Sequence, residues 1–187
     1  YTLQAEIEIM ERLHVNGSFL IDVLSPKRLQ SRVFELAGLP QQTIFDERGK
    51  CMVLSAIIEE QKDELTIYRG AAQSGTAGFT ARVSSMIASL KRSGLSAADV
   101  AESAEKLDAD NPARAKLGDI ARIYAAYEQR MAGELADAED VSREMCSRFA
   151  ASGIFKGQNV FVYGFDMITP TFAAELLSIA PLCHSLT

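Results

Sequence analysis

Along most of the chain, apolar residues recur every three or four positions, the spacing of an amphipathic helix, while two short apolar runs have the character of strands. The first helix is predicted over residues 2–13, and the run SFLIDVL, residues 18–24, predicts a strand. Ser25 is a good N-cap and Pro26 suits the first helical position, so a second helix is predicted from there to a C-cap at Gly38. The first forty residues therefore predict helix, strand, helix.

The middle of the chain shows helical spacing and no convincing strand. Ser96 and Asp99 are spaced as the partners of a capping box, and the small residues of 70–78 predict a loop. The strand pattern returns over residues 159–163, and a helix follows over residues 169–179. Five helices are expected in the middle block, around residues 53–65, 79–90, 96–107, 117–131 and 137–149.

This order predicts a helix-dominated α/β fold. Residues 1–45 and 154–187 would form β/α units of one partial parallel sheet, and residues 46–153 would form an all-helical subdomain inserted in it. Such a sheet needs more strands than the two expected here. We therefore expect the sequence to be a piece of a longer chain, which agrees with its beginning at Tyr1.

Composition narrows the class of protein. The chain has 187 residues, of which 48% are hydrophobic, and a formal net charge of −6, which argues against a strongly basic protein that coats nucleic acid. The cysteines Cys51, Cys146 and Cys183 lie far apart and form no CxxC pair, so we expect reduced thiols in a cytoplasmic protein and no zinc site. No signal peptide or membrane span is expected.

The most informative segment is NVFVYGFDMITP, which begins at residue 159. Nucleotide hydrolases place a magnesium-binding carboxylate at the tip of a buried strand, beside an acid that orients the attacking water. Here Tyr163 and Gly164 stand at that tip, Phe165 follows, and Asp166 comes three residues late. Asp166 is thus either a residue that turns the loop before the next helix or a metal ligand, and the first interpretation is favoured.

A second component of nucleotide hydrolysis is missing from the sequence. No GxxxxGK[ST] loop occurs, and the glycine-rich residues 74–78 lack the lysine that would contact a phosphate. No Ser-His-Asp or Cys-His arrangement is found either. We therefore assign this chain no catalytic residue, no metal ligand and no cofactor of its own.

Two helix ends carry basic residues that could contact DNA. Ser25 and Arg28 lie at the predicted start of a helix, where free N–H groups and the helix dipole favour a phosphate. Lys91 and Arg92 lie near the end of a helix. For each pair the alternative is an ordinary helix end with solvated charges.

Five segments in order resemble the N-terminal helicase-like region of the AddB/RexB family, the B subunits of bacterial ATP-dependent helicase/nucleases. They are YTLQAE at residue 1, VLSPKRL at residue 23, residues 82–95 with LKR, DAED at residue 137, and VYGF with ITP at residues 162–170. The five segments follow one another in the family's order and together span nearly the whole chain.

The resemblance implies a superfamily-1-like motor domain, with the sheet parts in subdomain 1A and the helical block in subdomain 1B. It implies a phosphate loop upstream of Tyr1 and a nuclease domain with iron–sulfur cysteines far downstream, so ATP, magnesium and the cluster would be bound outside this chain. It also implies a role in double-strand break repair, with single-stranded DNA and the A subunit as partners. Tyr163 stands where the family usually has Asp, which favours a degenerate motor that guides DNA.

Two other hypotheses remain open at this stage. The acidic net charge favours a helical protein-interaction module with no role in nucleic-acid binding. An active ATPase that uses Asp166 is the third, and it predicts magnesium-dependent nucleotide turnover.

Overall fold

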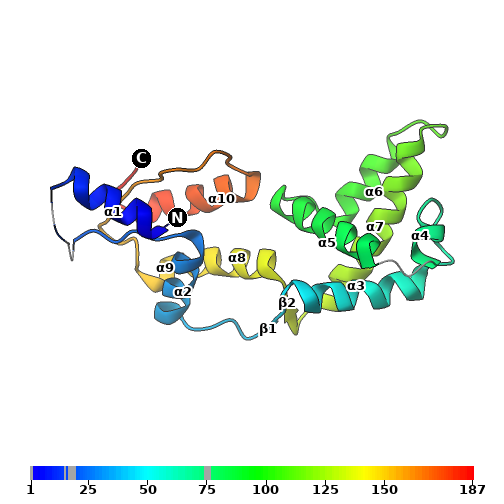
Figure 1. The fold of residues 1–187 in the computed structure, drawn as a ribbon, viewed down its shortest axis with the longest axis horizontal. Helices are drawn as coiled ribbons and strands as arrows, with labels where there is room; N and C mark the ends of the chain where they lie inside the picture. Colours follow the sequence, from blue (N-terminus) through cyan, green and yellow to red (C-terminus); the bar gives the residue numbers. More distant parts are fainter. Residues whose placement is uncertain (1, 15, 17–19, 74–76) are drawn as a thin grey trace.

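Two hydrophobic cores divide the described chain into two lobes that lie side by side (Figure 1). The structure is a computed structural model that describes residues 2–14, 16, 20–73 and 77–187. It is helix-dominated, with two short parallel strand pairs. Within the described residues, no helix is both long and apolar enough to cross a membrane.

The first lobe is built from both ends of the chain. Its core is centred on Val33, Phe34, Phe149, Phe155 and Ile179. It contains α1 (Thr2–Arg12), α2 (Pro26–Ala37), α8 (Ala138–Ser147), α9 (Phe149–Ser152), β3 (Asn159–Val160), α10 (Pro170–Ile179), η1 (Ala180–Leu182) and β4 (Ser185–Leu186).

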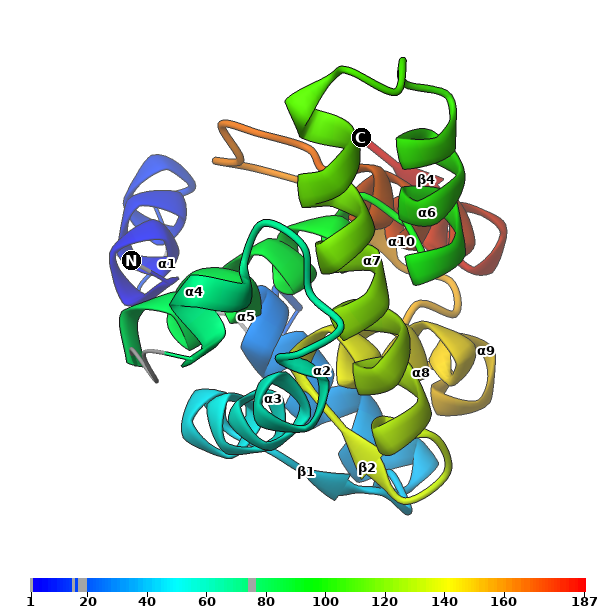
Figure 2. The ribbon, with the colours of Figure 1, turned by 90° about the vertical axis from the view of Figure 1, so that its right-hand side faces the viewer.

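The second lobe, which we call the helical lobe, is formed by one continuous stretch of the chain. Its core is centred on Leu54, Ile87, Ile123, Tyr124 and Tyr127, and in Figure 2 the long helix α7 runs beside α6. It contains α3 (Glu47–Gln61), α4 (Arg69–Gln73), α5 (Ala77–Arg92), α6 (Ala97–Glu105) and α7 (Pro112–Met131).

The chain crosses between the lobes at two adjacent places. β1 (Thr43–Ile44) leads into the helical lobe, and β2 (Leu135–Ala136) leads out of it. The two strands pair in parallel, with Thr43 opposite Leu135 and Ile44 opposite Ala136. The two connections therefore form one small strand pair at the junction (Figure 1).

The predicted strand at residues 18–24 is not formed over residues 20–24, and residues 18 and 19 lie outside the described residues. Leu20 is 94% exposed. β3 pairs in parallel with β4, so within the described residues the run 20–24 does not join the predicted strand at residues 159–163 in one sheet, as had been expected.

Two smaller differences concern the middle block. β2 lies within residues where no strand was expected, and its two residues are too few to leave a pattern. α4 occupies part of the predicted loop at residues 70–78. The buried residues of α8 and α9 belong to the core of the first lobe.

The predicted helix starts and stops are largely confirmed. The side chain of Ser25 caps α2, and Gly38 follows α2 with a positive φ of 92°. Ser96 and Asp99 form the expected capping box of α6. Thr169 caps α10, whose first residue is Pro170.

Candidate functional site

The start of α2 presents an exposed arginine beside a capped helix end. The Ser25 hydroxyl accepts a hydrogen bond from the Arg28 N–H at 3.2 Å. The Arg28 guanidinium donates to the carbonyl of Val23 at 3.4 Å and lies 3.7 Å from the carboxylate of Glu6 on α1. Both contacts are long, and the Arg28 side chain is 55% exposed. A guanidinium has five N–H donors, so this one retains donors for an anion.

Lys91 and Arg92, the other two predicted DNA contacts, lie side by side at the end of α5 but differ in their exposure to solvent. Arg92 is exposed, and its guanidinium donates to Glu139 at 2.9 Å and to the Ser89 hydroxyl at 3.2 Å. Lys91 is 5% exposed and turns into the protein, where its ammonium lies 2.8 Å from both Asp137 and Asp140. Lys91 is therefore a buried ion-pair residue rather than a surface cation.

Lys91 belongs to a buried charged cluster at the junction of the lobes, formed by Lys50, Lys91, Tyr127 and Asp137. Asp137 Oδ2 accepts hydrogen bonds from the Lys91 ammonium and the Tyr127 hydroxyl, each at 2.8 Å, and lies 3.4 Å from the Lys50 ammonium. All four side chains are nearly inaccessible to solvent. The cluster thus joins three helices of the helical lobe, α3, α5 and α7, to Asp137, the N-cap of α8.

Titration of Asp137 reflects this environment. Burial disfavours its carboxylate, but the hydrogen bond and charge of Lys91, with the charge of Lys50, outweigh that effect and hold the pKa of Asp137 well below its usual value. Burial first, and then the negative Asp137, raise the pKa of the Tyr127 hydroxyl well above its usual value. The phenol therefore remains a hydrogen-bond donor to the carboxylate.

The segment after β3 is open to solvent. Tyr163 is 64% exposed, Gly164 has a φ of 78°, and the Phe165 ring lies 4.6 Å from the ring of Phe172 on α10. Asp166 is exposed at a bend. Among the described residues, no group of three or more His, Cys, Asp and Glu side chains is placed to hold a metal ion.

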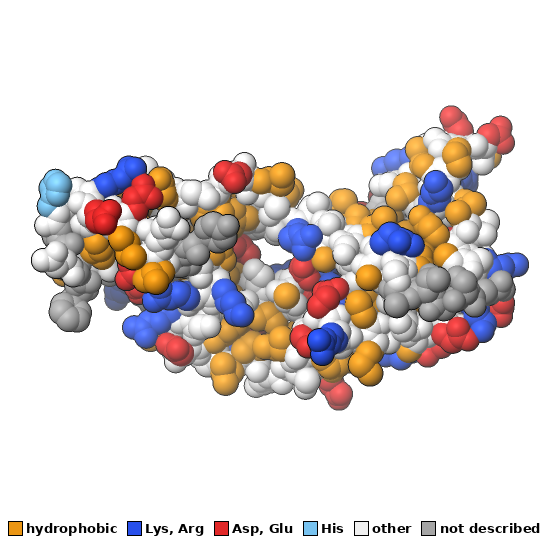
Figure 3. Space-filling view, viewed as in Figure 1, with side chains coloured by type: hydrophobic (Ala, Val, Ile, Leu, Met, Phe, Trp, Pro, Cys, Tyr) orange, Lys and Arg blue, Asp and Glu red, His pale blue; other side chains and the backbone are white. Residues whose placement is uncertain are grey.

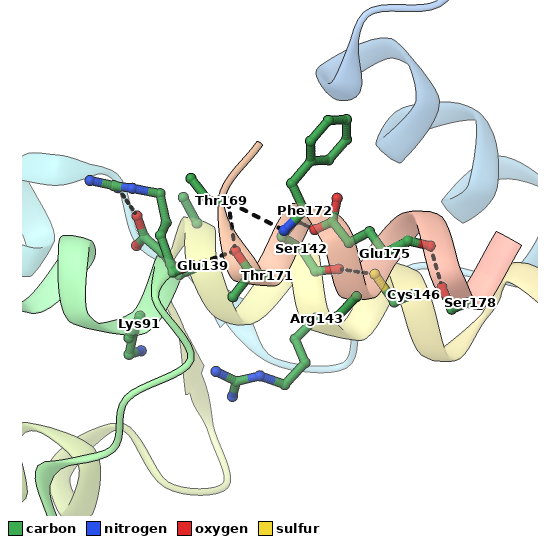
Figure 4. Close-up of a pocket in the computed structure, with 13 residues that line it drawn as sticks. Lys91, Glu139, Ser142, Arg143, Cys146, Thr169, Thr171, Phe172, Glu175 and Ser178 are labelled. Atoms are coloured by element: carbon green, nitrogen blue, oxygen red, sulfur yellow. Dashed lines mark hydrogen bonds and ion pairs between the residues drawn. The ribbon is translucent and has the colours of Figure 1, made fainter. Parts of the chain in front are cut away.

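A cavity of about 410 Å³ lies between α5, α8 and α10, and we call it the interlobe cleft (Figure 4). One helix of its wall is α8, which contributes Ser142 and Cys146, and the facing helix is α10, which contributes Thr171 and Glu175. The Ser142 hydroxyl donates to Glu175 across the cleft at 2.7 Å. Arg92, at the end of α5, completes the rim.

The structure does not gather the predicted site residues at one place. Ser25 and Arg28 lie at the start of α2 in the first lobe, whereas Arg92 lies at the end of α5 in the helical lobe (Figure 1). Tyr163 and Asp166 lie in the loop before α10. The buried cluster was missed, although Lys50 and Lys91 do continue the buried faces of their helices, which is a signal that the sequence offers.

Comparisons with known proteins point to one family. The family model described as "ADDB, N-terminal" matches residues 1–187. The chain is 30% identical over 190 residues to the B subunit of the ATP-dependent helicase/deoxyribonuclease of Moorella thermoacetica, covering 100% of this chain and 16% of that protein. It is 29% identical over 175 residues to the protein of the same name from Bacillus anthracis, covering 90% of this chain and 15% of that protein. The chain thus spans about one sixth of the length of these relatives.

Proposed function

This chain belongs to the AddB N-terminal family, and on that premise we propose that it is the N-terminal part of the B subunit of a bacterial ATP-dependent helicase/nuclease. In that complex it would act in the repair of DNA double-strand breaks and in recombination. Its task would be to bind and guide a DNA strand and to contact the A subunit. The names of its relatives support a role as one component of this kind of enzyme.

The exposed Arg28 beside the capped start of α2 is the observation that carries the DNA-binding role. The positive end of the helix dipole and the guanidinium lie together there, and both favour a phosphate of single-stranded DNA. Lys27 adds an exposed cation in the same turn. Arg92 is a secondary contact, and Lys91 takes no part because Asp137 and Asp140 bind its ammonium.

The residues present do not fit a magnesium–nucleotide. The position after the apolar run holds the phenol of Tyr163, which is exposed and offers no carboxylate, and the backbone turns at Gly164. Asp166 is the nearest acid, and it lies beyond that turn. We therefore derive no hydrolytic step for this chain, and the motor activity of the whole complex would reside elsewhere.

We propose that the first lobe represents subdomain 1A and the helical lobe the inserted subdomain 1B. Placing α8 and α9 in the first lobe would move the boundary from residue 153 to the neighbourhood of Asp137.

Binding of single-stranded DNA by the full-length protein tests the proposal. Arg28→Glu should weaken binding several-fold, and the slope of log K against log salt should become shallower by about 0.7, the value for one lost phosphate contact on a single strand. Arg32→Glu is the matched control, because Arg32 lies one turn further along α2 and its side chain is also 55% exposed. Fluorescence anisotropy over a salt series measures both quantities. Equal affinity and slope for the wild type and Arg28→Glu would remove the assignment.

A helical protein-interaction module is the second candidate function, and the exposed apolar side chains after β3 favour it. Phe161, Met167 and Ile168 are 74%, 77% and 55% exposed. In this case neither arginine variant would alter DNA binding, and Met167→Ser would weaken capture of the A subunit. The same two assays therefore separate the candidates.

A further inference from the structure

Helix α5 differs in charge from the other long helices that the structure describes. Among those helices of eight or more residues, α5 alone contains no Asp or Glu, although the chain as a whole has a formal net charge of −6. Its charged residues are Arg82, Lys91 and Arg92. Because Asp137 and Asp140 neutralise the buried Lys91, the two arginines carry the surface charge of α5.

Both arginines lie on one exposed face of α5. Arg82, Ser85, Ser89 and Arg92 are spaced by three, four and three residues, the spacing of neighbours along one side of a helix, and all four are exposed. We call these four residues the α5 stripe. At a rise of about 1.5 Å per residue, the two arginines stand roughly 15 Å apart along the helix axis. The serines between them are short, so an extended polymer can lie close to the helix and reach both arginines.

Arg82 has a guanidinium that no acidic side chain of the described residues neutralises. It lies on a helix without acids, so no carboxylate of α5 competes with an incoming anion. A guanidinium is always charged, and its planar fork of donors matches two oxygens of a phosphate. Arg82 is therefore suited to bind a phosphate on the helical lobe.

Arg92, at the other end of the stripe, is held by contacts that leave its charge accessible. Its guanidinium donates to Glu139 at 2.9 Å and to the Ser89 hydroxyl at 3.2 Å. The Arg92 side chain is 48% exposed, whereas that of Glu139 is 16% exposed. The acid thus orients the guanidinium without covering it. Arg92 also lies on the rim of the interlobe cleft, where the stripe ends (Figure 4).

We propose that the α5 stripe is a second contact for the backbone of single-stranded DNA, in which Arg82 and Arg92 each bind a phosphate. Figure 3 shows Lys and Arg side chains over α2 and over α5 on the same face of the molecule, so one strand can reach both Arg28 and the stripe. A contact made to phosphates alone carries no sequence preference. This inference rests on the proposed DNA-binding role and extends it from the first lobe to the helical lobe.

Binding of single-stranded DNA by the full-length protein, measured by fluorescence anisotropy over a salt series, tests the stripe. Arg82→Glu should make the slope of log K against log salt shallower by about 0.7, the value for one phosphate contact on a single strand. Between about 1 M and 0.1 M salt, that slope corresponds to about fivefold weaker binding at the lower salt. The loss should be equal for two strands of unrelated sequence. Arg82→Lys keeps the charge and should retain the slope of the wild type.

Lys116→Glu is the matched control. Lys116 is an exposed cation on α7 of the same lobe, lies off the stripe, and has no acidic partner in the described part of the chain. Its reversal should leave affinity and slope at the values of the wild type. Unchanged binding by Arg82→Glu, or an equal loss in Lys116→Glu, would overturn the stripe.

Arg28→Glu, measured in the same assay, separates this inference from the proposed function. If Arg28→Glu weakens binding and Arg82→Glu does not, the proposed function stands and the stripe falls. If neither variant changes binding, both fall. Unchanged DNA binding with weaker capture of the A subunit by Arg82→Glu would assign the exposed face of α5 to a protein contact, and would also overturn the stripe.

Discussion

At the scale of single residues, the charged groups buried between the lobes are the least expected feature. Asp137 is 1% exposed, yet it interacts with two lysines and a tyrosine at once. A buried charge without a partner destabilises a fold, so such a cluster is stabilising only while each of its charges is paired. Removing one member should therefore cost far more than removing a partner from a surface pair.

Lys50 and Lys91 also pair with Glu139 and Asp140, so neither lysine is left without a counter-charge when Asp137 is changed. Asp137→Asn should therefore lower the free energy of unfolding by about 1.5–3 kcal/mol, because the amide keeps the helix cap but removes the carboxylate that the two lysines share. Urea denaturation measures this. Glu64→Gln is the control, since its pair with Arg122 is more than half exposed on the acid side and should contribute about 0–1 kcal/mol. A loss below 1 kcal/mol for Asp137→Asn would show that the cluster does not stabilise the fold.

The same variant should change the dependence of stability on pH. The pKa of Asp137 is depressed in the folded state, whereas it is about 3.9 in the unfolded chain. Its contribution is therefore complete above that unfolded value and is lost as the pH falls below it. Between about pH 4 and pH 2, the wild type should lose stability more steeply than Asp137→Asn. Parallel curves would contradict the assignment.

The candidate contacts show what a sequence reveals about residues. The pattern of a helix start predicted the cap at Ser25 and the exposed Arg28 correctly, because both depend on local geometry. Lys91 continues the buried stripe of α5 at a spacing of four residues, which indicates that it turns inward, whereas Arg92 does not. The partners of Lys91, Asp137 and Asp140, could not be predicted from residues on α5 alone.

At the scale of elements, most helices follow from their own sequences. Capping residues and apolar spacing act over a few residues, so α2, α6 and α10 begin where the pattern predicts, whereas α7 begins at Pro112, five residues before its predicted range. Strands are harder to predict, because their pairing depends on a distant partner, and only β3 lies within a predicted strand. An apolar run at residues 20–24 forms no strand, while β4, with no strand pattern, pairs with β3.

Helix α4 shows how one element depends on another. Asp119 on α7 is 3% exposed, and its carboxylate accepts hydrogen bonds from the N–H groups of Thr66, Ile67 and Tyr68 at 2.8–2.9 Å. A distant carboxylate thereby binds the N–H groups that precede α4. This contact therefore helps to fix the position of residues 66–68 before α4.

Asp119→Asn should lower the free energy of unfolding by about 2 kcal/mol, because an amide offers one acceptor oxygen in place of two. Hydrogen exchange of the peptide that spans residues 62–70 should accelerate more than that of α6. Asp99→Asn is a useful comparison, because Asp99 accepts locally from Ser96 within the capping box of α6. Uniform acceleration along the chain would show that the contact has no local role.

At the scale of the whole molecule, the two cores should respond separately to damage. Ile87→Ala removes a fully buried side chain from the helical lobe, at a cost of roughly 2–5 kcal/mol. Hydrogen exchange should then accelerate in α3, α5 and α7 and change little in α2 and α9. Val33→Ala, also 0% exposed, should give the reverse pattern. An equal response of both lobes to either variant would show one cooperative unit.

The parallel pairing of β1 with β2 also bears on how this protein family could diversify. A chain that arrives along β1 needs a lateral step of about 4.8 Å, one strand spacing, to continue along β2 in the same direction. A gene deletion that joins Thr43 to Ala136 would thus bypass residues 44–135 with only a local backbone shift at the join, where consecutive Cα atoms must come within about 3.8 Å. Such a deletion would remove Lys50 and Lys91, so Asp137 would need a new counter-ion. With that one change, the helical lobe could be lost, enlarged or replaced during evolution while the first lobe is kept.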